Sequence, residues 1–543
     1  MAYSKFTKKV PIEVQNRSGF NCSHSNSFSA KCGTIMPILV DHLMPNTTVN
    51  LDVACEVNLP PAVSDFYGSI EARMEFFFVP YRVLWAGWKY FFVQPPQGGN
   101  GSIPSNNPST IQINYLPAVV AGATEQRFGA GTLSDMLGFK FRPGALNGNS
   151  VHIYNILPYV AYHSVYDHFY RDPRITQPLF YPPQNGQVAS TNRWTALPWV
   201  TAFGAADQAY TYDLNSDSTF FSLHQRCWDK DYFTNATYAP QAGNASYLTF
   251  STHGAANLET GETATAGAFS ISSLRVANAL QHFAEINNLA GQREADQQYA
   301  RFGCYPSDAA LDRPLYLGQK RFNVYKRSVY QQSQTEAGTT NPFSGILGNK
   351  TSALSGYGEG FLGKFHAKDA GLLMVMFTLV PQATYSTGTR RYLHYSKLAD
   401  FPEPLLQGVG DQPIHKFELL GGATWSSDTS VVDDFGYTQR YSECRFMSDE
   451  VHGKLRDGQD LAMFQLQRTF DTVVNLNTSF LEIPQNYLDQ VTTADASVSN
   501  YGCWCNAFFD YKKVQPLSAY SIPTLGDPKD THTVIIDNGG KRL

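Results

Sequence analysis

The sequence is poor in charge. Charged residues make up 16% of its 543 positions, against about 25% in an average soluble domain. This excludes an intrinsically disordered chain and a long coiled coil, which both need abundant charge. The 41 basic and 46 acidic residues give a net charge of −5, so no basic field covers the whole chain. Contacts with nucleic acid must then be local or made by another protein.

Long hydrophobic runs are also absent. The first nine residues contain lysines but no apolar run follows them, which argues against a secretory signal. The longest apolar stretch, at residues 371–380, is too short to cross a bilayer, which takes about 20 residues. We therefore expect a soluble protein made in a cytosol, without membrane insertion. Eight cysteines at low density then predict free thiols rather than a disulfide framework.

Motifs that carry chemistry are scarce. Residues 358–363 match G-x-G-x-x-G, but the predicted strand at 365–380 follows where a dinucleotide site needs a helix. The pair Cys503 and Cys505 lacks a second pair for zinc, and His163 and His168 are five residues apart rather than four. Adjacent carboxylates, as at 433–434, point to opposite faces of a strand. We predict no catalytic residue, no metal site and no cofactor.

What the chain has in quantity is aromatic residues and chain breakers. It contains 31 tyrosines, 36 phenylalanines and 7 tryptophans, with 42 glycines and 30 prolines spread along its length. Many turns between short segments favour a β-rich body. Apolar and polar residues alternate with period two at 49–57 and 70–76, as in half-buried strands. Further strands are predicted at 10–14, 31–40, 365–380, 436–447, parts of 462–483 and 505–514, which makes about eight to ten.

Two segments have helical patterns. Residues 155–170 carry an apolar stripe after Pro158, and residues 272–301 follow a candidate cap at Ser272 or Ser273. Between the elements lie long stretches rich in Gly, Asn, Ser and Pro, which are uncommon in compact domains unless they are functional. We therefore predict one β-domain with large insertions.

The N-terminus offers one candidate for contact with nucleic acid. Lys5, Lys8 and Lys9 stand next to Tyr3 and Phe6. Lysines can contact phosphates and aromatic rings can stack on bases. The alternative is a solvated, frayed terminus. We treat the three lysines as tentative DNA-facing residues.

Several segments, in order along the chain, resemble the major capsid proteins of Microviridae, small icosahedral phages with circular single-stranded DNA, and most of all the gokushovirus-like branch. The segments are 16–20 with 23–24, 37–41 with 43–46, 74–82 with Trp85 (the "VPYR" corner), 231–234 (DYFT) with 239–241, 273–275, 441–451, and 508–511 with 514–516 and 520–523. No single segment is decisive, but together they cover residues 16–525.

The resemblance implies a mainly β fold, an eight-stranded antiparallel jelly roll of viral capsid type with long loop and helical insertions. One capsid domain would span 1–543, with an N-terminal arm at 1–30, strands mainly within 31–95 and 361–520, insertions at 96–360 that include the two helices, and a tail at 526–543. It also implies a 60-subunit homo-oligomer, a T=1 shell around single-stranded DNA, with a small basic internal DNA-binding protein and a host surface receptor as partners.

The resemblance further implies a structural role in the virion rather than an enzyme, with synthesis and assembly in the bacterial host cytoplasm. The interval 242–271 is shorter than the surface insertion that gokushovirus-type proteins often carry, so we expect the threefold protrusion to be small, absent or built from another loop. The alternative is a β-rich carbohydrate-binding protein or glycoside hydrolase, because glycosidase carboxylates leave no local motif.

Overall fold

The computed structural model describes thirteen main ranges: 17–60, 66–85, 118–122, 125–140, 151–176, 211–213, 219–240, 313–330, 350–395, 400–421, 434–470, 474–492 and 502–517, with single residues and short pieces between them. Lys5, Lys8 and Lys9, the strand predicted at 10–14, the interval 242–271 and the tail at 526–543 lie outside the described residues. Most of the helix predicted at 272–301 also lies outside them, but described positions such as Arg275 and His282 are helical.

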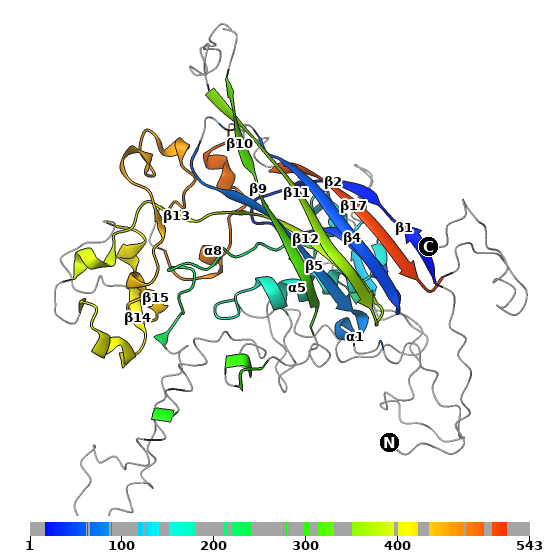
Figure 1. The fold of residues 1–543 in the computed structure, drawn as a ribbon, viewed down its shortest axis with the longest axis horizontal. Coiled ribbons are helices and arrows are strands. Elements are labelled where there is room, and N and C mark those ends of the chain that lie inside the picture. The colour runs from blue at the N-terminus through cyan, green and yellow to red at the C-terminus, as the bar shows by residue number, and fades with distance from the viewer. Residues whose placement is uncertain are drawn as a thin grey trace, which may run out of the picture.

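Two antiparallel sheets form the body of the molecule (Figure 1). The larger sheet has six described strands: β1 (Ser18–Asn21), β2 (His24–Ala30), β4 (Thr47–Asn58), β10 (Tyr325–Tyr330), β11 (Lys350–Ala367) and β17 (Cys503–Gln515). The smaller sheet has four: β3 (Met36–Leu43), β5 (Ile70–Pro80), β9 (Leu315–Asn323) and β12 (Gly371–Pro381). One hydrophobic core fills the space between the sheets.

The strand order is that of a jelly roll. In the larger sheet β2 and β1 both pair with one edge of β17, followed by β4, β11 and β10, and in the smaller sheet the order is β3, β12, β5, β9. The chain crosses between the sheets from β2 to β3, to β4 and to β5, and again from β9 to β11, to β12 and to β17. The predicted mainly β jelly roll is confirmed. β1 and β10 extend the larger sheet, and without them each sheet has four strands.

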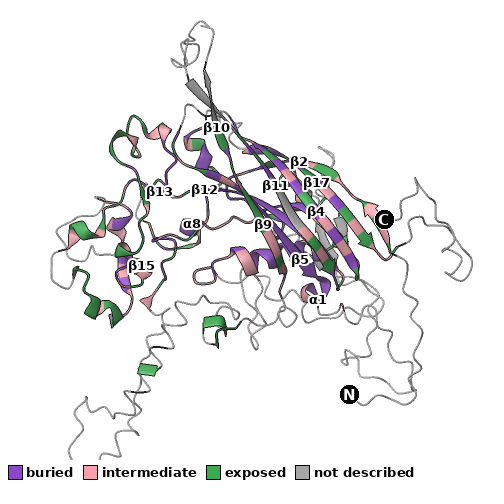
Figure 2. Cartoon of the chain, in the orientation of Figure 1, coloured by how far each residue is buried: buried purple, intermediate pink, exposed green. Residues whose placement is uncertain are grey.

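The burial of the strands follows their sequence pattern. Along β4 buried residues alternate with more exposed ones, so one face meets the core and the other meets solvent (Figure 2). β12 is buried over its whole length. Leu373 and Phe377 face the core between the sheets, whereas Leu372 and Met374 face a second apolar cluster beyond the smaller sheet. A strand covered on both faces needs the continuous apolar run seen at 371–380.

A helix supplies the second cover. α5 (Leu157–Val165) and the π-helical turn Tyr166–Tyr170 that continues it confirm the helix predicted at 155–170. Pro158 lies in the first turn of α5, where its missing N–H costs no helical hydrogen bond. The buried side chains of α5, including Tyr159 and Tyr162, pack with Phe77 of β5 and Met374 of β12. Among the described residues, no helix is long and apolar enough to cross a membrane.

Smaller elements complete the described part of the chain. Near α5 these are α1 (Tyr81–Leu84), β6 (Ala118–Gly122), α3 (Glu125–Phe128), α4 (Leu133–Met136), β7 (Val151–Asn155), β8 (Thr211–Asp213) and the 3-10 turn Thr219–Phe221. Residues 384–492 form a lobe beside the sandwich with β13 (Thr384–Tyr385), β14 (Gln412–His415), β15 (Asp434–Thr438), β16 (Asp449–Glu450) and α8 (Thr478–Leu481). The lobe has its own apolar cluster, which includes Ile414, Leu419 and Phe480.

Strand boundaries differ from the expected ones in four places. The strand expected at 365–380 is divided, since its first residues end β11 in the larger sheet and residues from 371 onward form β12 in the smaller sheet. β2 belongs to the sandwich although residues 1–30 were expected to be an arm, and β9, β10 and most of β11 fall within the expected insertion. The lobe segments at 436–447 and 462–483, expected as strands, form mostly short 3-10 turns, single bridges and α8. Their backbone hydrogen bonds run mostly within short turns rather than along strand ladders.

Glycines explain why β11 was not recognised. The motif at 358–363 lies inside the strand, where a Cβ on Gly358 would come within 2.4 Å of the ring of Phe322 on β9. At Gly363 the φ angle is +85° and the register with β4 shifts. The glycines therefore permit close packing and a bulge. The motif therefore lies within a strand rather than in a loop before one.

Candidate functional site

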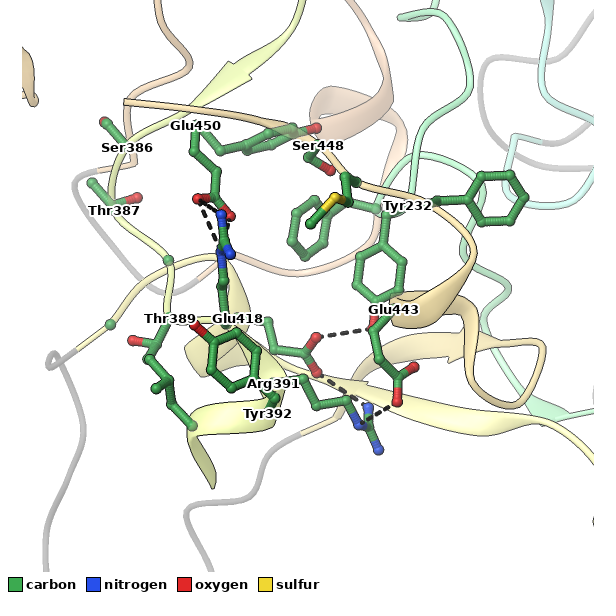
Figure 3. Close-up of a pocket in the computed structure, with 18 of the residues that line it drawn as sticks. Tyr232, Ser386, Thr387, Thr389, Arg391, Tyr392, Glu418, Glu443, Ser448 and Glu450 are labelled. Atoms are coloured by element: carbon green, nitrogen blue, oxygen red, sulfur yellow. Dashed lines mark hydrogen bonds and ion pairs between the residues drawn. The ribbon is translucent and has the colours of Figure 1, made fainter. Parts of the chain in front are cut away.

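The lobe contains a cavity of about 790 Å³ (Figure 3). It lies between the turn at 386–395, the segment 443–452 and two side chains, Tyr232 and Phe233, from the segment 219–240. Apolar rings and charged groups both line it.

A buried glutamate forms the floor. Glu418 Oε1 accepts hydrogen bonds from the backbone N–H of His415 (3.0 Å) and from Arg391 (3.3 Å), and its Oε2 accepts one from the Tyr232 hydroxyl (2.9 Å). Burial raises the pKa of Glu418, although these donors favour its charged form. The same burial, with the Glu418 charge close by, raises the pKa of Tyr232. Glu418 therefore ties three segments of the chain together.

A second glutamate lies on the other side of Arg391. Glu443 accepts hydrogen bonds from the Tyr395 hydroxyl at 3.0 Å and from the side-chain amide of Gln412 at 2.5 Å, and Arg391 Nε is 3.8 Å from its Oε1. Both oxygens of Glu418 and both oxygens of Glu443 thus have donors from the protein. A glycosidase needs one carboxyl that can give a proton and one that can reach the sugar or a water. The described geometry instead makes these carboxylates internal cross-links.

The rim is more exposed. Arg390 and Glu450 form a two-bonded ion pair, with Arg390 Nη2 2.6 Å and Nε 2.7 Å from the two carboxylate oxygens. The hydrogen bonds from Arg390 lower the pKa of Glu450. Beside this pair, four large apolar side chains stand in solvent and together form what we call the rim patch: Tyr392, Leu393, Phe446 and Met447.

The rim patch is unusual because its members gather at one opening. Phe446 is 59% exposed and Met447 is 85% exposed. Single exposed apolar residues are normal on a soluble monomer, whereas a group of them at one place marks an interaction site. Interfaces are enriched in aromatic residues and Met at their centres. The rim patch is therefore the lobe's strongest candidate for a contact with another molecule.

The residues weighed in the sequence do not meet at this cavity. His163 is fully buried on α5 and hydrogen bonds to His224 and to the carbonyl of Phe220, while His168 bonds to the carbonyl of Ser164. These are packing roles. Cys503 and Cys505 are buried with their sulfurs 3.5 Å apart. All eight cysteines are free thiols, and the described residues contain no group of three potential metal ligands.

The cavity had no signal in the sequence. Its charged residues are spread from Arg390 to Arg456 without a fixed spacing. No pattern in the sequence indicated where on the fold this cavity lies.

The proteins to which this chain is similar agree with the jelly-roll fold. The family described as "Capsid protein (F protein)" matches residues 8–266 and 257–525. Capsid protein VP1 of Bdellovibrio phage phiMH2K is 25% identical over 95% of this chain and 96% of its own length. Capsid protein VP1 of Chlamydia phage 1 is 21% identical over 95% of this chain and 97% of its own. Capsid protein VP1 of Spiroplasma virus 4 is 24% identical over 47% of this chain and 45% of its own. The chain therefore belongs to the F-protein family of capsid proteins, the major capsid proteins of Microviridae, and within it to the gokushovirus-like branch.

Proposed function

We propose that this structural capsid protein assembles as a 60-subunit homo-oligomer into a T=1 icosahedral shell around circular single-stranded DNA. The observation that carries the proposal is a jelly roll flanked by a lobe whose apolar rim patch is left in solvent. When different surfaces of identical subunits contact each other, the assembly becomes a closed symmetric shell if the rotation that relates neighbouring subunits leads back to the first subunit. Many modest contacts of this kind then make assembly cooperative.

The whole chain, 1–543, acts in this proposal as one capsid domain. Its net charge of −5 leaves most of the DNA charge to counterions, to local basic residues and to a small basic internal DNA-binding protein. Lys5, Lys8 and Lys9 remain candidates for the local contribution. Exposed loops would meet a host surface receptor, and synthesis and assembly would take place in the bacterial host cytoplasm before the protein becomes part of the virion.

Electron microscopy of the purified full-length chain tests assembly. Uniform small icosahedral particles are expected, and a protein that stays monomeric at high concentration would contradict the proposal. A variant without residues 1–9 tests the arm separately, because particles should still form but should retain less DNA. Unchanged DNA content would remove the three lysines from the proposal.

The alternative, a β-rich carbohydrate-binding protein or glycoside hydrolase, rests on the lobe cavity with Glu418 and Glu443. We expect no catalysis, because both carboxylates are held by protein donors. Isothermal titration with oligosaccharides and a glycan-hydrolysis assay decide between the two. Turnover that is lost in Glu418→Gln and in Glu443→Gln would favour the enzyme.

A further inference from the structure

The outward face of the larger sheet carries exposed aromatic rings. Along β17 the inward side chains Cys505, Ala507 and Phe509 are buried, whereas the outward ones are open to solvent (Figure 2). Among the outward residues, Trp504 and Phe508 are each 52% exposed. They lie on one face of one strand, four residues apart, at about 3.3 Å per residue. A rigid strand therefore holds two rings at a fixed separation of roughly 13 Å.

Small side chains surround both rings. In the sheet register, Trp504 lies opposite Asn58 on β4 and Ser29 on β2. Phe508 lies opposite Ala54 on β4 and Ser25 on β2. No large neighbour in these register positions covers a ring, so the ring faces remain open to a flat partner.

Hydrogen-bonding groups lie between the rings. Asn506 stands between Trp504 and Phe508 on the same face, and its Oδ1 accepts a hydrogen bond from Ser27 Oγ at 3.0 Å. Asn506 is exposed and its NH₂ group can donate a hydrogen bond, and the serines of β2 offer further hydroxyls. Flat apolar faces beside amide and hydroxyl groups match a nucleobase, which has π-faces and a polar edge. A partner protein that placed an apolar side chain here would leave the Asn506 amide and the serine hydroxyls without hydrogen-bond partners.

Charge is divided along the same face. The far end of the sheet carries the exposed basic side chains Arg17, Lys364 and Lys512, and an exposed histidine, His366. A row with Asp52 and Asp510 separates this end from the aromatic end, and Lys512 Nζ is 3.1 Å from Asp510 Oδ2. Glu56 also lies at the aromatic end, held by the side-chain amide of Asn58 at 3.1 Å. Positive charge is thus available for phosphates at one end, and the rings are available for bases at the other.

We propose that this face of the larger sheet binds single-stranded nucleic acid, with bases stacked on Trp504 and Phe508 and the backbone led toward Lys364 and Lys512. The proposal rests on the proposed function, in which the shell encloses single-stranded DNA, and it places this face of the subunit toward the genome. Sequence-independent stacking suits a shell that must accept any genome sequence.

Binding of a fluorescent twelve-nucleotide oligothymidylate to the purified full-length chain provides the test, measured by anisotropy. The variant Trp504→Ser/Phe508→Ser should bind at least tenfold more weakly, because stacking on an aromatic ring contributes about 1–3 kcal/mol per base. Tyr238→Ser is the matched control, since Tyr238 is 78% exposed but lies outside this face. The loss of oligonucleotide affinity in Trp504→Ser/Phe508→Ser should persist at high salt. In contrast, Lys364→Ser/Lys512→Ser should mainly reduce the dependence of the affinity on salt concentration.

Equal affinities of the double variant and the Tyr238→Ser control would overturn the proposal. So would a double variant that keeps its oligonucleotide affinity but no longer forms particles, because the face would then be a contact between copies of the chain. Ultraviolet cross-linking of particles adds an independent measurement, with nucleotide adducts expected on the peptides that contain Trp504 and Phe508. Failure of the chain to form particles would contradict the T=1 shell, while the oligonucleotide measurement would still decide the binding face.

Discussion

His163 Nδ1 lies 2.8 Å from His224 Nε2, and both rings are buried beneath the smaller sheet. Burial lowers the pKa of His163 far below its usual value and lowers that of His224 to about 3. The Tyr166 ring stacks on His224 with centroids 3.9 Å apart, which leaves no room for hydration. The pair is therefore held neutral, with one ring donating to the other.

This pair predicts loss of stability in acid. A histidine whose folded pKa is depressed contributes its full stability above pH 6.5 and loses it as the pH falls toward 3, because the unfolded chain binds the proton first. We expect the protonation of the unfolded chain at His224 alone to lower the unfolding free energy by about 3 kcal/mol at pH 4.5. His224→Gln should show a smaller drop in unfolding free energy between pH 7 and pH 4.5 than the wild type. His366→Gln, at an exposed site, should keep the wild-type drop.

At Glu482 we expect the opposite dependence of folding stability on pH. Burial raises its pKa to about 7, so the folded chain keeps a proton that the unfolded chain releases. Its contribution is favourable below about pH 4.5 and is lost as the pH rises through 7. Glu482→Gln should raise the Tm by about 2–4 °C at pH 8.5 and leave it unchanged at pH 5. The exposed Glu403→Gln serves as control, and equal shifts in both variants would contradict the prediction.

The ion pair between Arg226 and Glu75 should be expensive to break. Arg226 Nη1 and Nη2 lie 2.8 and 3.2 Å from the two Glu75 oxygens, both side chains are nearly covered, and the Tyr170 hydroxyl also bonds to Glu75. Arg226→Met leaves the Glu75 charge buried without its partner, at a cost of about 3–5 kcal/mol. Arg390→Met breaks the exposed pair with Glu450, which is screened by solvent, and should cost far less than Arg226→Met. Urea denaturation measures both, and similar losses would refute the distinction.

Gly358 should not tolerate a side chain. A Cβ there would lie 2.3–2.8 Å from three carbon atoms of Phe322. Gly358→Ala should therefore force β9 and β11 apart and cost about 1–3 kcal/mol by overpacking. Gly19→Ala is the control, because nothing lies within 4 Å of a Cβ at that position in β1. Equal urea midpoints for the two variants would show that the strands can separate without cost.

The rim patch should matter for assembly and not for folding. Phe446→Ser/Met447→Ser removes two side chains that are more exposed than buried, so the Tm should stay within about 1 °C of the wild type. Particle yield on a sucrose gradient should fall at least tenfold if the two side chains anchor a contact. Tyr238→Ser should assemble normally. Normal particle yield from the double variant would exclude the patch from the main contacts.

Strand patterns were readable wherever one face is buried and the other is solvated. The alternation at 49–57 became β4, and the apolar run at 371–380 became a strand covered on both faces. Pro158 marked the first turn of α5. In each case the signal is local, as an alternation with period two, a continuous apolar run or a proline at a helix start, so no knowledge of distant residues was needed.

The glycines of β11 and the polar segments of the lobe were misjudged for a common reason. Gly358 lies in a strand because Phe322 of β9 occupies the space above it, and Phe322 is far away in sequence. Segment 436–447 begins in β15 but then turns where an extended strand was expected. Tyr441 has a φ of +62°, and its backbone N–H donates to Gln412 Oε1 from another part of the lobe. Partners of this kind cannot be inferred from composition or periodicity.

The sequence by itself determined the fold class and the family, because period-two patterns and ordered motifs are properties of neighbouring residues. Only the tertiary structure decided which side chains meet: the carboxylates around Arg391, the four residues of the rim patch, and the rings of Trp504 and Phe508 among serines of another strand. The low charge of the chain is consistent with the rim patch and with the face that carries Trp504 and Phe508. A subunit that covers much of its surface in an assembly needs fewer charges to stay in solution. The exposure of a side chain depends on which elements pack over it, and this packing exists only once segments that are distant in the sequence have come together.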